Sequence, residues 1–215
     1  MSMYDDWFYR LIRDGATESA NAAVPLIADL LALQPGDRVV DVGCGEGWWA
    51  AAFAAAGADV CGIDSARPPG CALTQQQFLA ADLTQPLPAL TGDLTVCLEV
   101  GEHLPHERAE TFVAELCRIA PTVLWSAAVP GQGGHGHINE QWPDYWVPMF
   151  EANGMSVSGA LRWMLWDNDR IEPWYRQNLL VAARNPFAVP LLFNTPTAAP
   201  WPVVHPALFT ARTAA

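Results

Sequence analysis

The chain has 215 residues, and 51% of them are hydrophobic, so we expect one sizeable core. Its formal net charge is -12, and we expect no nucleic-acid partner because an acidic surface repels a phosphate backbone. Its eleven basic side chains are all arginine, which excludes chemistry that needs a Schiff-base or P-loop lysine. The five cysteines include no CxxC pair, and the acidic N-terminus is unlike a signal peptide, so we expect a cytoplasmic protein. The sequence also has no long apolar run, and we therefore expect no membrane partner.

Strand-like and helix-like segments alternate along the chain. Helical spacing covers 5–14, 17–33, 48–57, 105–120 and 142–154, and apolar runs predict strands over 38–42, 58–64, the end of 75–83, 92–100, 122–129, 155–166 and 177–185. This alternation indicates a mostly parallel α/β sheet with helices on both faces. Only the polar loop 167–176 joins the last two predicted strands, so we expect them to form an antiparallel hairpin. The proline-rich stretch from Pro186 onward is predicted to be extended or irregular.

A glycine-rich turn, "VVDVGCGEG", follows the first predicted strand and precedes a helix. Gly43, Gly45 and Gly47 allow positive φ angles and let the backbone approach a ligand closely, as nucleotide-binding turns require. The spacing is GxGxG, which differs from the GxGxxG of dinucleotide-binding turns. The turn therefore indicates a nucleotide-like ligand without identifying it.

Three aspartates lie at or near the carboxyl ends of successive strands. Asp41 lies in the approach to the glycine turn, Asp64 ends the second strand and Asp82 ends the third. An isolated aspartate in such a place is more often a solvated strand end or a helix cap. Three of them on one edge of a parallel sheet favour ligand binding, because a carboxylate at this edge can accept hydrogen bonds from ribose hydroxyls.

These residues lead to a family. The stretch "VVDVGCGEGWWAAAFAAAGADVCGIDS" resembles motif I and the following acidic strand end of class I S-adenosylmethionine-dependent methyltransferases, and the resemblance covers roughly residues 35–184. It implies a Rossmann-like, doubly wound, seven-stranded sheet whose last strand is antiparallel. It also implies that S-adenosylmethionine is the cofactor and that its site is formed by Asp41, Gly43, Gly45, Asp64, Ser65, Asp82, Leu83 and Glu99. Within this set, Asp64 would bind the ribose, and Asp82 with Leu83 would flank the adenine.

The first segment, "FYRLIRDGATESANAAVPLI", is similar to the leader of a bacterial subgroup of these enzymes. We expect residues 1–34 to form a helical lid, 35–185 the methyltransferase domain and 186–215 a proline-rich tail. The lid interpretation places Tyr9 or Ser19 near the methionine end of the cofactor. Simple helical packing remains an equal alternative for these two side chains.

The stretch "CLEVGEHLP" concentrates ionisable groups at the end of the fourth predicted strand. Glu99, Glu102 and His103 form an E-x-x-E-H pattern there, and two carboxylates with an imidazole suit a hard or borderline divalent ion. The loop "GHGHINE" follows the next strand, and adjacent parallel strands end at the same edge of a sheet. We therefore expect His137 as a fourth ligand, with His135 as the second choice.

E-x-x-E-H with a later histidine resembles the metal-dependent O-methyltransferases, among them small-RNA and ubiquinone-pathway enzymes. The resemblance implies that the metal holds the acceptor hydroxyl, with His103, Glu102 and His137 as the catalytic set. The alternative is that His103 acts as a general base without a metal.

The aromatic residues beyond this stretch concern the acceptor. Trp166 and Trp174 bracket "DNDRIEP", a loop that would shape the acceptor pocket in such a fold. We expect methyl transfer to a hydroxyl of a sugar or another natural product. N-methylation without a metal is the first alternative, and an NAD-dependent oxidoreductase is a more distant one. The sequence leaves a homo-oligomer open.

Overall fold

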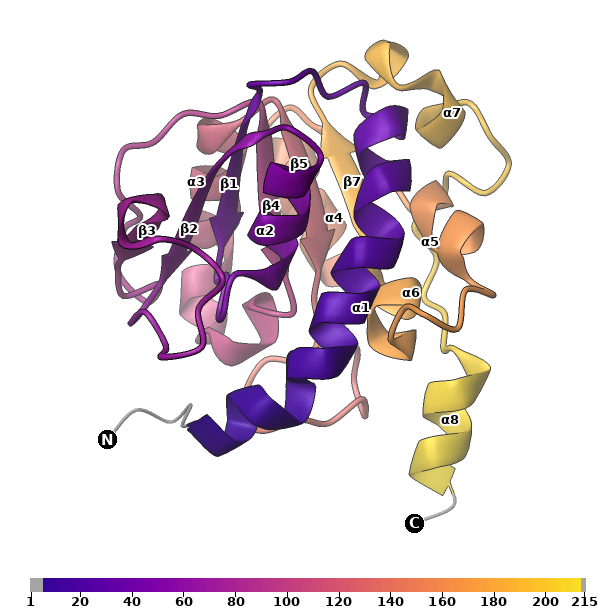
Figure 1. Cartoon of the computed structure of the whole chain (residues 1–215). Helices are drawn as coiled ribbons and strands as arrows, with labels where there is room; N and C mark the ends of the chain where they lie inside the picture. Colours follow the sequence, from indigo (N-terminus) through magenta and orange to yellow (C-terminus); the bar gives the residue numbers. More distant parts are fainter. Residues whose placement is uncertain (1–5, 214–215) are drawn as a thin grey trace.

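The computed structural model describes the backbone of residues 6–213 and the side chains of residues 13–211. A seven-stranded sheet forms its centre (Figure 1), and the strands are β1 (Arg38–Val42), β2 (Asp59–Asp64), β3 (Phe78–Ala80), β4 (Leu94–Leu98), β5 (Thr122–Ser126), β6 (Ser156–Ser158) and β7 (Leu180–Ala183). The strand order is β3-β2-β1-β4-β5-β7-β6. Strands β1 to β5 pair in parallel, and β7 runs antiparallel to both of its neighbours. The predicted Rossmann-like sheet with an antiparallel last strand is confirmed.

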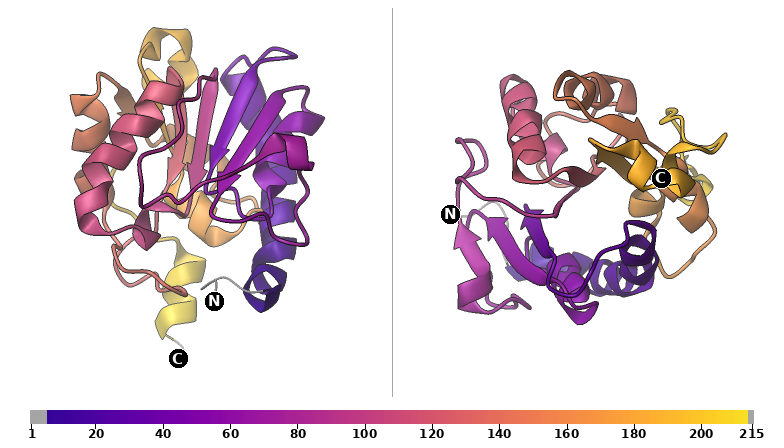
Figure 2. Two further views of the ribbon diagram at one scale, coloured as in Figure 1. Left: turned by 90° about the vertical axis from the view of Figure 1, so that its left-hand side faces the viewer. Right: turned by 90° about the horizontal axis from the view of Figure 1, so that it is seen from above.

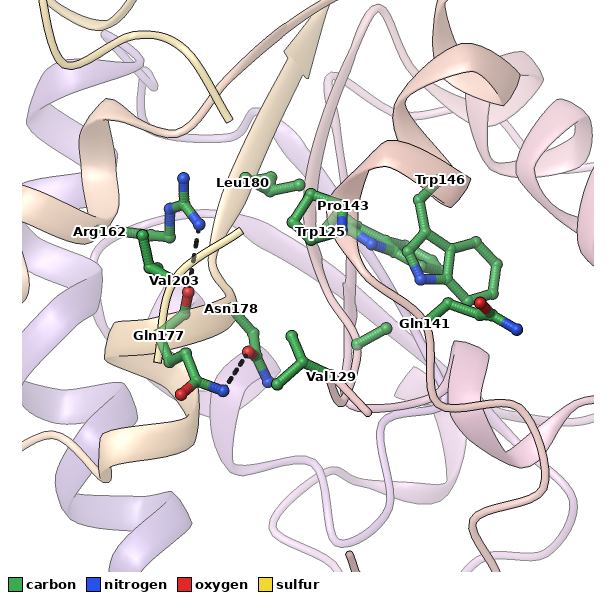
Figure 3. Close-up of a pocket in the computed structure, with 11 residues that line it drawn as sticks. Trp125, Val129, Gln141, Pro143, Trp146, Arg162, Gln177, Asn178, Leu180 and Val203 are labelled. Carbon is green, nitrogen blue, oxygen red and sulfur yellow. Dashed lines mark hydrogen bonds between the residues drawn. The ribbon is translucent and has the colours of Figure 1, made fainter. Parts of the chain in front are cut away.

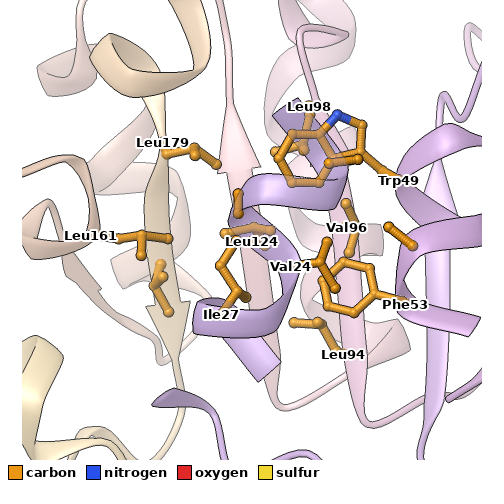
Figure 4. Packing of buried hydrophobic residues seen from close by; sticks show 14 of the residues in the cluster. Val24, Ile27, Trp49, Phe53, Leu94, Val96, Leu98, Leu124, Leu161 and Leu179 are labelled. Carbon is orange, nitrogen blue, oxygen red and sulfur yellow. The ribbon is translucent and has the colours of Figure 1, made fainter. Parts of the chain in front are cut away.

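Helices cover both faces of the sheet (Figure 2). One face carries α1 (Asp6–Leu30), α2 (Trp48–Ala55) and α5 (Ala160–Leu165), and the other carries α3 (Ala109–Ile119) and α4 (Pro143–Ala152). Successive side chains of a strand point to opposite faces. Val39 accordingly packs under α1 and α2, in the cluster shown in Figure 4, whereas Val40 packs in the second cluster against α3.

Helix α1 is one continuous helix, not the two separate helical stretches expected at 5–14 and 17–33. Its second half belongs to the core, because Ala20, Ala23, Val24 and Ile27 are buried against α2 and the sheet. The division of the chain into lid, domain and tail stays a prediction. Among the described residues, no helix combines the length and apolar character that a bilayer crossing requires.

The connection before β7 is helical, which corrects two expectations. The strand predicted over 155–166 is limited to β6, because the chain turns at Gly159 and the good helix formers after it build α5. Helix α6 (Pro173–Asn178) begins with a proline at its first position, and it occupies the end of the predicted polar loop and the start of the strand predicted over 177–185. The antiparallel pairing of β6 and β7 is nevertheless as predicted.

The tail expected to be extended or irregular contains helices as well. Residues Pro190–Phe193 form α7 and Pro206–Thr213 form α8. Each begins at a proline, whose fixed φ suits a first helical position and whose missing N–H is not needed there. Figure 1 shows α8 at the same end of the molecule as the first half of α1. Two of the prolines in this stretch therefore begin helices, although a proline-rich composition predicts an irregular chain.

Candidate functional site

A cavity of about 930 Å³ lies at the carboxyl ends of the parallel strands. This volume is in the range of small-molecule sites. All eight residues of the implied cofactor site line it: Asp41, Gly43, Gly45, Asp64, Ser65, Asp82, Leu83 and Glu99. His103, His135 and His137 line the same cavity. The ends of separate strands thus converge on one space, as the parallel sheet required.

The glycine turn has the backbone that its sequence predicts. Gly43, Gly45 and Gly47 have φ angles of 79°, 53° and 77°, and a Cβ at Gly43 would overlap with Val100. The amide of Gly45 donates to Asp64 Oδ2 over 2.8 Å. Asp64 therefore fixes the turn from the neighbouring strand, and the turn needs glycine both for its angles and for its close approach to the next loop.

The other two aspartates have different surroundings. Asp41 is 3% exposed and accepts from the amide of Ala50 over 3.2 Å. Burial, with a smaller contribution from Asp64, raises the pKa of Asp41 to about 7, although the Ala50 bond opposes the shift. Asp82 accepts from the amide and the hydroxyl of Thr84, over 2.9 and 2.7 Å, and these bonds hold the pKa of Asp82 below its ordinary value. Asp41 thus supports the start of α2, whereas Asp82 shapes the loop after β3.

The chain makes a strained turn directly after β4. Glu99 has a φ of 55°, the left-handed region that costs a non-glycine residue roughly 1–2 kcal/mol. A short 3-10 helix follows at Gly101–His103, and a Cβ on Gly101 would lie 2.7 Å from the Trp125 ring. The turn therefore packs closely against Trp125 of the core. The left-handed backbone at Glu99 directs the side chain of Glu99 into the cavity.

Three of the four predicted metal ligands come together. Glu102, His103 and His137 each offer a ligand atom, and these atoms all lie within 4.8 Å of one another. Glu102 is fully buried, and neither of its carboxylate oxygens has a hydrogen-bond partner of normal geometry among the described residues. Burial raises the pKa of Glu102 well above its ordinary value, and the charge of Glu99 adds to this shift. A divalent cation would satisfy these oxygens.

The two histidines present lone pairs suited to a metal or to proton transfer. His103 Nδ1 bonds the carbonyl of Gly136 over 3.2 Å, and a carbonyl can only accept, so the lone pair is on Nε2. Burial, with a smaller effect of His137, lowers the pKa of His103 to about 4. The imidazole of His103 is therefore neutral at pH 7.

The orientation of the His137 ring is fixed by Glu140, a residue that was not predicted from the sequence. Glu140 Oε1 lies 2.9 Å from His137 Nδ1, and the same carboxylate accepts from the amides of Gly131, over 2.8 Å, and Gly133, over 2.6 Å. A carboxylate that orients a histidine in this way is common around metal sites. The spacing of three residues between His137 and Glu140 in "HINE" was the available signal.

Glu99 and His135 lie outside this group of three. The Glu99 carboxylate accepts from Asn178 Nδ2 over 3.0 Å and from Gln132 Nε2 over 2.8 Å. Its role as a metal ligand stays a prediction. His135 lines the cavity, but His137, the first choice from the sequence, is the histidine that joins Glu102 and His103. The amides on Glu99 were not predicted, because neither "GQGG" nor "WYRQN" indicates a contact by itself.

Helix α1 reaches the site through Arg13. Arg13 Nε donates to Glu46 Oε2 over 2.8 Å, and Glu46 also accepts from Trp48 Nε1 over 3.1 Å. Ser19 donates to the carbonyl of Gly15 and accepts from the amide of Glu172, so it packs α1 against the α6 region and does not line the cavity. The side chain of Tyr9 lies outside the described residues. Of the two tryptophans that bracket the loop after α5, only Trp174 lines the cavity.

Comparison with known proteins places this site in a family. A family model described as a methyltransferase domain matches residues 16–169. The ubiquinone biosynthesis O-methyltransferase of Pseudomonas syringae pv. tomato is 37% identical over 81 residues, which cover 33% of this chain and 34% of that protein. The match therefore spans about a third of the length of this curated relative.

Solved structures share the fold. The magnesium protoporphyrin IX methyltransferase of Synechocystis, with bound S-adenosylmethionine, has a TM-score of 0.58 and 24% identity, and the match covers 84% of this chain and 85% of that one. A sugar N-methyltransferase from Streptoalloteichus has a TM-score of 0.59 and 15% identity, with 86% and 96% covered. At these identities the likeness concerns the fold alone.

Proposed function

Since the chain belongs to the class I S-adenosylmethionine-dependent methyltransferases, we propose that it methylates a hydroxyl group of a small molecule with the help of a divalent metal ion. The observation that carries this proposal is the group formed by Glu102, His103 and His137, two of which line the same cavity as the glycine turn. The strand order β3-β2-β1-β4-β5-β7-β6 with an antiparallel β7 also differs from the 3-2-1-4-5-6 order of the dinucleotide-binding Rossmann fold. We therefore set the oxidoreductase alternative aside.

The cofactor half of the cavity suits S-adenosylmethionine. The cofactor supplies an electrophilic methyl group on a sulfonium, and transfer is an in-line displacement that depends on alignment and on the exclusion of water. Asp64 has carboxylate lone pairs beyond its bonds to Gly45 and Ser65, and these can accept from ribose hydroxyls. Glu99 would lie next to the methionine part, where the ligand carries positive charge. Burial raises the pKa of Glu99, and its hydrogen bonds with Asn178, Ser126 and Gln132 oppose this shift.

The acceptor half fits a divalent ion by its donor set. One carboxylate and two imidazoles suit a borderline ion such as Mn²⁺, Zn²⁺ or Ni²⁺. A bound ion would supply a Lewis acid that lowers the pKa of an acceptor hydroxyl. The buried carboxyl group of Glu102 is the structural reason to propose it, because its oxygens have no hydrogen-bond partner of normal geometry among the described residues and such burial is costly. Glu140 would orient His137 toward the ion.

The second candidate is metal-free transfer with His103 as the general base. Its Nε2 lone pair and its neutral state at pH 7 favour this role. A base with a pKa of about 4, however, accepts a proton from an alcohol poorly, since an effective base has a pKa near the working pH. The depressed pKa of His103 therefore supports the metal-assisted mechanism for a hydroxyl acceptor, while an amine acceptor would need no such help.

The test is a methyl-transfer screen against phenols, sugars and amines, with and without EDTA. We expect turnover of a hydroxyl acceptor that EDTA abolishes and Mn²⁺ restores. His137→Ala should lose this turnover and weaken Mn²⁺ binding in calorimetry. His135→Ala is the matched control, because His135 lines the same cavity outside the group of three. Turnover that resists EDTA would support His103 as the base, and calorimetric binding of NAD without S-adenosylmethionine would overturn the whole proposal.

A further inference from the structure

We propose that Gln177 is a positioning residue through which the docked C-terminal segment, residues 198–211, sets the orientation of the Glu99 carboxylate in the cofactor site. This inference rests on the proposed function, because it concerns the affinity for S-adenosylmethionine and its product. Gln177 is 1% exposed and lies in α6, between the C-terminal segment and the loop after β5 (Figure 3).

The side-chain amides between the C-terminal segment and Glu99 form one connected chain. The amide N–H of His205 donates to Gln177 Oε1 over 2.8 Å. Gln177 Nε2 donates to Asn178 Oδ1 over 2.9 Å and to Gln132 Oε1 over 3.2 Å. Asn178 Nδ2 and Gln132 Nε2 then donate to the two oxygens of Glu99. Two routes of hydrogen bonds thus run from Gln177 to one carboxylate.

The direction of the bonds through Gln177 and Asn178 follows from the first donor. Gln132 Oε1 also accepts from the amide of Val129, over 3.4 Å, and from Asn178 Nδ2, over 2.9 Å. A backbone N–H can only donate, so the oxygen of the Gln177 amide must face His205 and its nitrogen must face Asn178 and Gln132. These two amides then have their oxygens occupied, and their nitrogens face Glu99. If the side-chain amide of Asn178 or Gln132 were flipped, its oxygen would lie against an oxygen of the Glu99 carboxylate. The main chain of the C-terminal segment therefore sets the polarity of the route through Asn178, and the amide of Val129 supports the same polarity at Gln132.

The C-terminal segment is also part of the cavity. Leu208 and Ala211 of α8 line it. Hydrogen bonds from both sides hold the segment near α5 and α6. Arg162 donates to the carbonyl of Trp201 over 2.9 Å, and His205 Nε2 of the segment donates to the carbonyl of Trp166 over 3.1 Å. Docking of the segment thus does two things together: it closes one wall of the cavity and it orders the amides on Glu99.

A coupling of this kind is reciprocal. If docking of the segment improves the affinity for a ligand that contacts Glu99, the bound ligand must stabilise the docked segment by the same factor. A residue with a merely structural role would change the stability of the protein without linking these two events. The link therefore provides the measurement that separates the two roles.

The experiment measures the binding of S-adenosylhomocysteine by calorimetry to the full chain, to a chain ending at Ala199, and to Gln177→Met in both backgrounds. We expect Gln177→Met to weaken binding about tenfold in the full chain and less than threefold in the shortened chain, because the segment no longer sets the polarity there. Gln141→Met is the matched control. Gln141 and Gln177 both line a second, small cavity, which is shown in Figure 3, but Gln141 donates to Asn139 and not toward Glu99. The affinity of Gln141→Met for S-adenosylhomocysteine should therefore stay within threefold of that of the unaltered chain.

Protease cleavage within residues 200–211 gives an independent measurement. S-adenosylhomocysteine should slow this cleavage in the original chain and in Gln141→Met, but not in Gln177→Met. Equal losses from Gln177→Met in both chain lengths, or no loss, would overturn the inference while leaving the proposed function intact. Failure of the unaltered chain to bind S-adenosylhomocysteine would instead overturn the proposed function. If Gln177→Met does not fold, an unchanged affinity of the chain ending at Ala199 overturns the inference.

Discussion

Replacement of Glu102 by methionine should make the metal-free protein more stable. Glu102 is fully buried, and both of its oxygens are without a hydrogen-bond partner of normal geometry among the described residues. A buried polar group in this state costs about 1–3 kcal/mol. Methionine is unbranched, apolar and similar in length, so Glu102→Met removes this cost without opening a large cavity. A gain of this size corresponds to a rise in Tm of about 3 °C for each kcal/mol in a chain of this length.

The gain should depend on pH in a defined direction. The pKa of Glu102 is raised above its ordinary value of 4.5 in the folded protein, so the folded state retains a proton that the unfolded state has lost. Stability of the unaltered protein is therefore lost as the pH rises above about 4.5. The advantage of Glu102→Met should consequently be larger at pH 8 than at pH 5.

Glu115 provides the matched control, because it is a buried glutamate with partners. It forms an ion pair with Arg108 and accepts from the amide of Leu87 over 3.0 Å. Glu115→Met leaves the buried Arg108 without its carboxylate, which should destabilise the protein by about 3 kcal/mol. The assay is thermal unfolding followed by far-UV circular dichroism in EDTA at both pH values. A Glu102→Met protein that is less stable than the original at pH 8 would refute the reasoning.

Three further predictions concern the cavity. Gly134→Ala would place a Cβ against the His137 imidazole, so calorimetry should show at least tenfold weaker Mn²⁺ binding with unchanged S-adenosylhomocysteine binding. The pKa of Asp41 is raised to about 7, so its burial should cost stability progressively as the pH rises from about 4 toward 7 and above; Asp41→Asn should flatten this part of the profile of Tm against pH. Asp64→Ala removes the acceptor of the Gly45 amide and should weaken S-adenosylhomocysteine binding about tenfold, whereas a change below twofold would show that the turn does not depend on it.

Much of the sheet could be predicted because its strands carry an unambiguous signal. The apolar runs that became β1, β2, β4 and β5 are bounded by glycine, proline or charged residues, and the helix between the first two is rich in alanine. The segment after Gly159 carried no such signal. A stretch such as "ALRWMLW" is apolar enough for a strand but also rich in good helix formers, so its periodicity alone does not decide between the two.

The site could be predicted in outline but not in its supporting contacts. His137 was found because the carboxyl ends of β4 and β5 must lie side by side in a parallel sheet. The contacts of Glu140, Gln132 and Asn178 depend on the path of loops whose conformation is not encoded by a local pattern. An amide has no preferred partner in the sequence, so its role becomes visible only when the acceptor that it faces is known.

The five residues from 99 to 103 unite two features that oppose folding at pH 7 and a third, at His103, that opposes it only in acid. Glu99 occupies the left-handed region, Glu102 is buried without a normal hydrogen-bond partner among the described residues, and His103 lies where its charged form is disfavoured. Core packing alone would not retain this combination, since an apolar residue at position 102 would avoid the cost of an unsatisfied carboxylate. Features that lower the stability of a fold are found most often at its functional sites, where ligands bind. A cation would offset the cost at Glu102, and the neutral imidazole of His103 is the form that binds a metal, so these two neighbours together support a metal site more strongly than either alone.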